Sequence, residues 1–69
     1  MAFSTEDLTE AKRQIDSTLH KLRETIKTLE QKENPQQYRS QITLAKRRVD
    51  AFEIAVSLIE KEIAEKSRA

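Results

Sequence analysis

The residues best suited to chemistry in this sequence surround its single histidine. His20 has Asp16 four residues before it and Glu24 four residues after it, so on a helix the three side chains would share one face. Carboxylates that flank an imidazole can bind a metal ion. The Glu-x-x-His spacing of carboxylate-bridged helical bundles is absent, however, because residue 17 is serine. Nothing closes the coordination sphere, and we expect a solvated helix face with no bound metal.

Nucleophilic catalysis has less support still. The serines and threonines fall at helix caps or at outward helical positions, and the lone histidine has no matched partner. The sequence contains no cysteine and no glycine, which excludes disulfides, cysteine-based metal sites and glycine-rich phosphate loops. The two-helix fold derived below is also expected to lack a concave pocket. We therefore expect a non-enzymatic protein without a cofactor.

The strongest polar signal is a basic cluster near the middle of the chain. Lys46 and Arg47 belong to "AKRRVD", Arg39 lies seven residues before Lys46, and an antiparallel first helix would bring Lys21 and Arg23 opposite them. This basic girdle could follow a nucleic-acid backbone. The architecture resembles that of the small plasmid copy-control hairpins of the Rop type, which bind RNA as dimers, although no residue pattern is shared. The net charge of +1 argues against this function, and nucleic-acid binding is the alternative hypothesis.

The elements that must position these residues are helices. The 69 residues form one domain and are dominated by good helix formers such as Glu, Lys, Arg, Gln, Ala and Leu. With no glycine and only 4% aromatic residues, strands and tight turns are not expected. The N-terminal "MAFSTEDL" is acidic where a signal peptide is basic, and the apolar run at 51–59 is far shorter than the ~20 residues that span a bilayer. We expect an all-α cytoplasmic protein that does not enter membranes.

Capping signals predict a first helix over about residues 4–32. Ser4 is a good N-cap, and Asp7 three residues later forms a capping box with it. Phe3 and Leu8 have the spacing of a hydrophobic staple across this helix start. The first helix therefore has a well-defined beginning.

The segment "KENPQQY" predicts a turn at about residues 33–35 and a second helix over about 35–66. Asn34 suits the N-cap and Pro35 the first helical position. Gln37 is placed to close a second capping box. So short a connection makes the two helices antiparallel neighbours.

Apolar residues in both helices repeat at alternating spacings of three and four, the a/d heptad pattern of a coiled-coil seam. In the first helix, where Lys12 takes one seam position, these residues are Leu8, Ile15, Leu19, Leu22, Ile26 and Leu29. In the second helix they are Tyr38, Ile42, Ala45, Val49, Phe52, Val56, Ile59 and Ile63. The sequence thus predicts a long antiparallel helical hairpin.

The stretch "VDAFEIAVSLIEKEI" carries more apolar residues than this seam needs. On a helical wheel, the surplus forms a second face next to the seam, made of Leu44, Ala51, Ile54, Ala55 and Leu58, and Arg48 lies at its rim. We expect the stem of Arg48 to pack there and its guanidinium to meet a carboxylate. A small chain without disulfides commonly covers such a face by oligomerisation.

The first hypothesis for this second face is a homodimer in which two hairpins form a four-helix bundle. The small side chains of Ala51 and Ala55 would let the backbones approach closely. A different protein could instead place its own amphipathic helix on the same face. Both hypotheses give the protein a role in protein–protein contacts.

The charged positions beside the seam bear on the register of the two helices. The e positions directly follow the d positions, on one side of the seam. If the e positions of the two helices face each other from the turn outward, Glu30 faces Arg39, which is favourable. Arg23 then faces Lys46, and one heptad further Asp16 faces Glu53. Like charges that face each other are unfavourable. We expect a register shift of one turn to remove this conflict.

Overall fold

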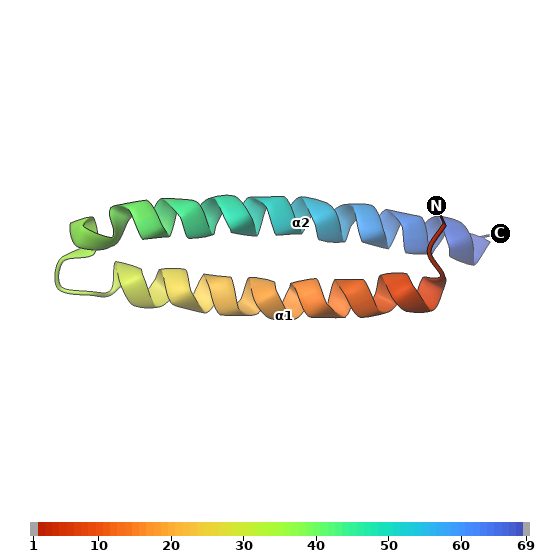
Figure 1. Ribbon diagram of the computed structural model, residues 1–69, viewed down its shortest axis with the longest axis horizontal. Coiled ribbons are helices and arrows are strands. Elements are labelled where there is room, and N and C mark those ends of the chain that lie inside the picture. Colours follow the sequence, from red (N-terminus) through yellow and green to blue (C-terminus); the bar gives the residue numbers. More distant parts are fainter. Residues whose placement is uncertain (1, 69) are drawn as a thin grey trace.

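The computed structural model describes residues 2–68 and shows two long antiparallel helices (Figure 1). Helix α1 covers Thr5–Glu30, a 3-10 turn η1 covers Pro35–Tyr38, and helix α2 covers Arg39–Arg68. The rod measures 53 × 17 × 15 Å, and both chain ends lie at the end opposite the turn. The predicted all-α helical hairpin is confirmed.

The start of α1 follows the predicted chemistry. The Asp7 amide donates to Ser4 Oγ at 3.0 Å, and the Ser4 amide donates to Asp7 Oδ2 at 3.4 Å, which is the expected capping box. Glu6 and Asp7 also place negative charge at the positive end of the helix dipole. The helix ends at Glu30, two residues before the predicted end.

The connection differs from its prediction. The side chain of Asn34 makes no capping hydrogen bond, and the chain enters a 3-10 turn in which the Gln37 amide donates to the Asn34 carbonyl at 3.1 Å. The second capping box is therefore wrong, and the α-helix begins at Arg39 rather than at residue 35. The 3-10 turn satisfies these amides by i→i+3 bonds, and α2 then runs two residues past its predicted end.

The predicted seam is the core of the hairpin. Its buried members are Leu8, Leu19, Ile26, Ala45, Val49 and Val56. Its other members are half-buried: Ile15, Leu22, Leu29, Tyr38, Ile42, Phe52, Ile59 and Ile63. Within residues 2–68 no side chain has less than 2% of its surface exposed, so the core is one layer thick and every core residue lies near solvent.

Candidate functional site

The seam divides the surface of the hairpin into two long flanks with different chemistry. We define the charged flank by the charged residues at the e positions of both helices, which are Asp16, Arg23, Glu30, Arg39, Lys46, Glu53 and Glu60. We define the charge-poor flank by positions on the other side of the seam, which are Ala11, Thr18, Thr25, Leu44, Arg48, Ala51, Ala55, Leu58 and Glu62. Each helix contributes to both flanks because 3.6 residues per turn place e and g positions on opposite sides of the seam.

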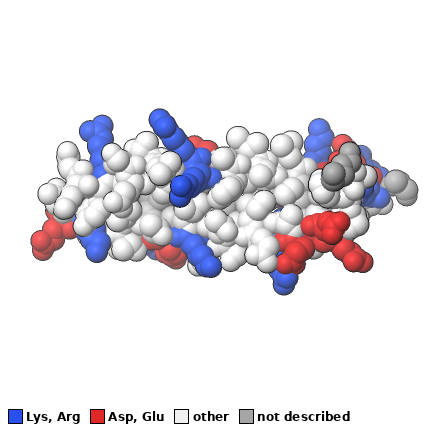
Figure 2. Space-filling view, viewed as in Figure 1, with Lys and Arg blue, Asp and Glu red and all other residues white. Residues whose placement is uncertain are grey.

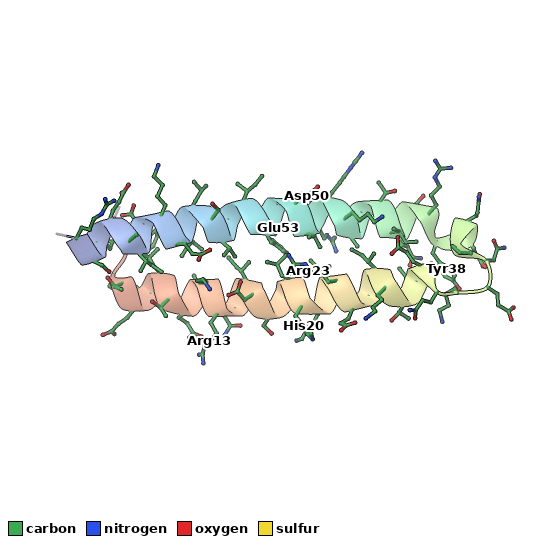
Figure 3. All side chains as sticks on the ribbon, turned by 180° about the vertical axis from the view of Figure 1, so that it is seen from behind. Arg13, His20, Arg23, Tyr38, Asp50 and Glu53 are labelled. Atoms are coloured by element: carbon green, nitrogen blue, oxygen red, sulfur yellow. The ribbon has the colours of Figure 1, made fainter. Side chains whose placement is uncertain are left out.

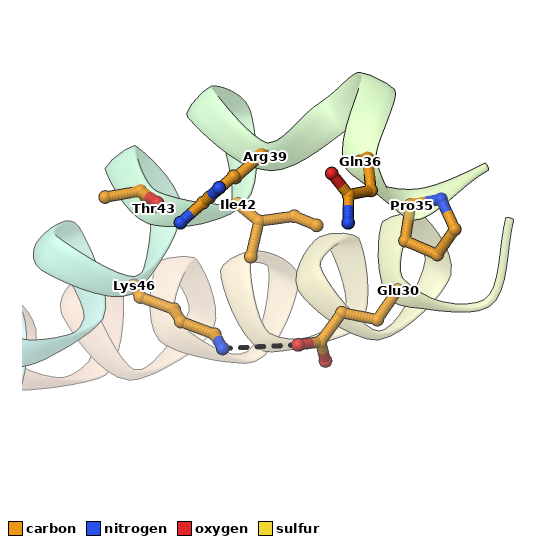
Figure 4. A pocket seen from close by; sticks show the side chains of 7 residues that line it. All are labelled: Glu30, Pro35, Gln36, Arg39, Ile42, Thr43 and Lys46. Carbon is orange, nitrogen blue, oxygen red and sulfur yellow. Dashed lines mark ion pairs between the residues drawn. The ribbon is translucent and has the colours of Figure 1, made fainter.

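Ion pairs join the two helices along the charged flank. Arg23 Nη2 lies 3.2 Å from Glu53 Oε1, and Lys46 Nζ lies 3.2 Å from Glu30 Oε2; Figure 3 shows Arg23 and Glu53 pointing toward each other between the helices. Glu30 therefore pairs with Lys46 and not with Arg39, the residue it would face if the e positions met from the turn outward. Each pair joins e positions that lie one heptad further from the turn than that arrangement assumes, and long side chains reach along the seam to meet, as those of Lys46 and Glu30 do in Figure 4. Arg23 thereby meets an opposite charge rather than a like one.

The same flank continues with a charge cluster toward the open end of the hairpin. Lys12 Nζ donates to Asp16 Oδ2 at 2.8 Å. The hydrogen bond to Asp16, the charge of Asp16 and the charge of Glu60 each raise the pKa of Lys12 above its usual value. Lys12, which interrupts the apolar seam, thus holds its positive charge beside Asp16 of its own helix, where Glu60 of the other helix also favours it.

Two shallow hollows lie on the charged flank of a hairpin that we expected to lack a concave pocket. One of about 320 Å³ is lined by Glu30, Arg39, Lys46 and their neighbours near the turn (Figure 4). A second of about 280 Å³ lies beside Arg23 and Asp50. Lys46 reaches Glu30 across the first hollow, whereas Arg39 in the same lining forms no ion pair with a residue in the range 2–68.

The basic girdle predicted from the sequence is not one continuous surface. Arg23 and Lys46 point into the charged flank, where carboxylates of the opposite helix neutralise them. Lys21, Arg39 and Arg47 are exposed and form no ion pair with any residue in the described range 2–68. Their heptad positions differ, and Figure 2 shows the basic side chains spread along the rod rather than gathered.

The charge-poor flank presents the surplus apolar residues to solvent. The exposed fraction is 50% for Leu44 and 62% for both Leu58 and Ile54, which lies at the outer edge of this flank. Ala51 is also exposed, and Ala55 is half-buried. In Figure 2 this flank faces the reader as a largely uncharged surface with basic and acidic groups mainly at its edges. One hairpin alone leaves the predicted second face uncovered.

An apolar hollow extends the charge-poor flank toward the open end of the hairpin. It has a volume of about 540 Å³ and is lined by Phe3, Asp7, Leu8, Ala11 and Ile59. Phe3, which is predicted to pack on Leu8, is itself 53% exposed and covers this hollow only in part. Sequence reasoning missed the hollow, although the absence of charge at Ala11 was a signal for it.

Arg48 is exposed and forms no ion pair within residues 2–68. The carboxylate that we expect beside it is therefore not supplied by the described part of its own chain. Glu62, two heptads further along α2, is likewise exposed without an ion pair in this range. The charge-poor flank thus carries two opposite charges that its own hairpin leaves uncompensated.

The carboxylate–histidine set does not form a metal site. His20 is exposed and points away from α2 in Figure 3. Across residues 2–68 there is no group of three or more histidine, cysteine, aspartate or glutamate side chains that could hold a metal ion. In the same range, neither helix has the length and apolar composition needed to cross a membrane.

Comparisons with known proteins give no family for this chain. No protein-family model matches it, and no curated protein and no solved structure matches it significantly. The chemistry of the two flanks is therefore the basis for the functional proposal.

Proposed function

We propose that this hairpin is a non-enzymatic protein that forms a homodimer and acts through protein–protein contacts. Its charge-poor flank would cover the same flank of a second copy, which gives a four-helix bundle. One observation carries the proposal: Leu58 and Ile54, each 62% exposed, lie beside a core in which no described side chain is fully buried. Burial of such residues contributes about 25 cal/mol per Å² of apolar surface.

The size of the hairpin supports the same conclusion. Chains this short bury a small share of their surface on folding and commonly gain stability from oligomerisation when they lack disulfides. A stable interface covers about 800 Å² on each partner. One flank of a rod 53 Å long and 17 Å wide provides a surface of that order.

The nucleic-acid alternative receives less support. Arg23 and Lys46, which belong to the proposed basic girdle, are paired with carboxylates of the opposite helix. The remaining basic groups do not share one face. A gel shift with generic RNA or DNA at about 50 mM salt, where the electrostatic contribution is strong, tests this alternative directly.

The homodimer is tested by the solution mass of the full chain and of two variants. We expect the wild type to sediment at twice its chain mass of 8.0 kDa. Leu58→Glu should sediment as a single chain, because it places a charge in the apolar interface. The matched control is Ser57→Glu, which adds the same charge at the neighbouring position on the other side of α2 and should remain dimeric.

Circular dichroism of each variant separates loss of association from loss of folding, since a dissociated but folded hairpin keeps its helical signal. A wild-type mass of one chain at micromolar concentration would contradict the proposal. In that case an amphipathic helix of a different protein becomes the better candidate for the exposed flank.

A further inference from the structure

The pattern of residues along the exposed side of α2 specifies more than an apolar patch. Ala51, Ile54, Ala55 and Leu58 have the i, i+3, i+4, i+7 spacing of a helix-packing stripe. Arg48 lies one turn before this stripe and Glu62 one turn after it. The stripe therefore has a positive end and a negative end.

These two charges cannot compensate each other within one chain. Arg48 and Glu62 are 14 positions apart on one straight helix, which separates them by about 21 Å at 1.5 Å per residue. Neither forms an ion pair within residues 2–68, whereas Arg23 and Lys46 on the charged flank both do. Interhelical ion pairs thus compensate Arg23 and Lys46 on the charged flank, while Arg48 and Glu62 on the other flank have no ion pair within residues 2–68.

We infer that two copies pack α2 against α2 in antiparallel orientation, with Arg48 of each copy facing Glu62 of the partner subunit. This inference rests on the proposed homodimer and adds its orientation and register. The two-fold axis would pass close to Ala55, so that Ala51 faces Leu58 of the partner subunit and the larger side chain fits over the smaller one. Opposite charges would then meet at both ends of the apolar stripe.

A parallel arrangement of the same two helices is disfavoured by the same charges. It would bring Arg48 beside Arg48 of the partner subunit and Glu62 beside Glu62 of the partner subunit, and like-charge contacts oppose association. Arg47 and Lys61 share a heptad position with Ile54, at the edge of the stripe opposite Arg48 and Glu62. The charges of Arg48 and Glu62 therefore favour the antiparallel arrangement.

Complementary charge reversals test this register in the full chain. The variants are Arg48→Glu and Glu62→Arg, each analysed alone and in an equimolar mixture by sedimentation over a range of concentrations. Each variant alone brings like charges together twice per dimer, so we expect the dimer to dissociate about 10- to 100-fold more readily than wild type. The mixture restores opposite charges at both ends, and its mass should return to that of the dimer.

The matched control is Glu24→Arg, which reverses a charge on the outer surface of α1 and should leave association unchanged. The inferred register is overturned if the mixture dissociates as readily as the separate variants, or if both variants associate as tightly as wild type. If Leu58→Glu dissociates the protein while the charge reversals have no effect, the homodimer stands and the register is overturned. If wild type is itself a monomer, the homodimer and the register are both overturned.

Discussion

The two flanks of the hairpin lie on either side of one seam, and they differ in whether their charges form ion pairs within the chain. On the charged flank, Arg23 and Lys46 meet Glu53 and Glu30 of the opposite helix at 3.2 Å in each case. On the charge-poor flank, the same two helices offer threonines, alanines and leucines, and Arg48 has no ion pair within residues 2–68. Charges of both helices are paired with each other on the first flank, and the second is the surface that we propose for a partner.

This difference separates the interactions that align the two helices from the surface that we propose for association. Exposed ion pairs contribute little free energy, but they penalise a wrong register because the alternative brings like charges together. The charged flank therefore specifies how α1 and α2 align. The charge-poor flank contributes little to the alignment of the two helices, since Leu58 and Ile54 remain exposed in the hairpin.

The largest expected effect comes from the seam that both flanks share. Leu19 is 4% exposed and belongs to the central core cluster, so Leu19→Ala should lower the free energy of unfolding by about 2–5 kcal/mol through lost burial and a cavity. Ser17→Ala, two residues earlier on the exposed outer surface of α1, should change it by less than about 0.5 kcal/mol. Urea denaturation of both variants measures these values. Equal destabilisation by the two would show that the seam is not the main source of stability.

A smaller effect is expected on the charged flank. Arg23 and Glu53 have side chains that are 55% and 52% exposed, so a double-mutant cycle with Arg23→Ala and Glu53→Ala should give a coupling free energy of about 0.2–1 kcal/mol. The coupling should decrease as salt is added, because these charges are exposed.

The solution mass of both charged-flank variants should equal that of wild type, unlike the mass of Leu58→Glu. A charged-flank variant that changes the oligomeric state would remove the distinction between the flanks. Substitutions on the charged flank should therefore change stability, and substitutions on the charge-poor flank should change association.

The sequence predicts the parts of this fold that depend on local chemistry. The capping box of Ser4 and Asp7 and the apolar seam were both predictable, because helix starts and heptad spacing depend only on residues close together in the sequence. The uncovered face around Leu58 was predictable for the same reason, since helical periodicity alone separates it from the seam. Its occupant remains a proposal.

The features that were not predicted depend on how two segments meet. The pairing of Arg23 with Glu53 depends on how far each side chain reaches along the seam once both helices are in place, and neither helix contains this information alone. The 3-10 turn after Asn34 was also not predicted, because Asn34 and Pro35 are compatible with the start of an α-helix or of a 3-10 helix. The apolar hollow beside Phe3 required both helices to be placed first.

The smallest expected effect concerns the pH dependence of the charged flank. Because Asp16 and Glu60 raise the pKa of Lys12 in the folded chain, the folded state binds this proton more tightly than the unfolded state. The resulting stability is fully present below the unfolded pKa of about 10.4 and is lost as pH rises through the folded value. Thermal melts at about pH 9 and pH 11.5 should therefore show a larger loss for wild type than for Lys12→Met. Identical losses would mean that Lys12 does not link the two carboxylates, and the charged flank would then consist of its two interhelical ion pairs alone.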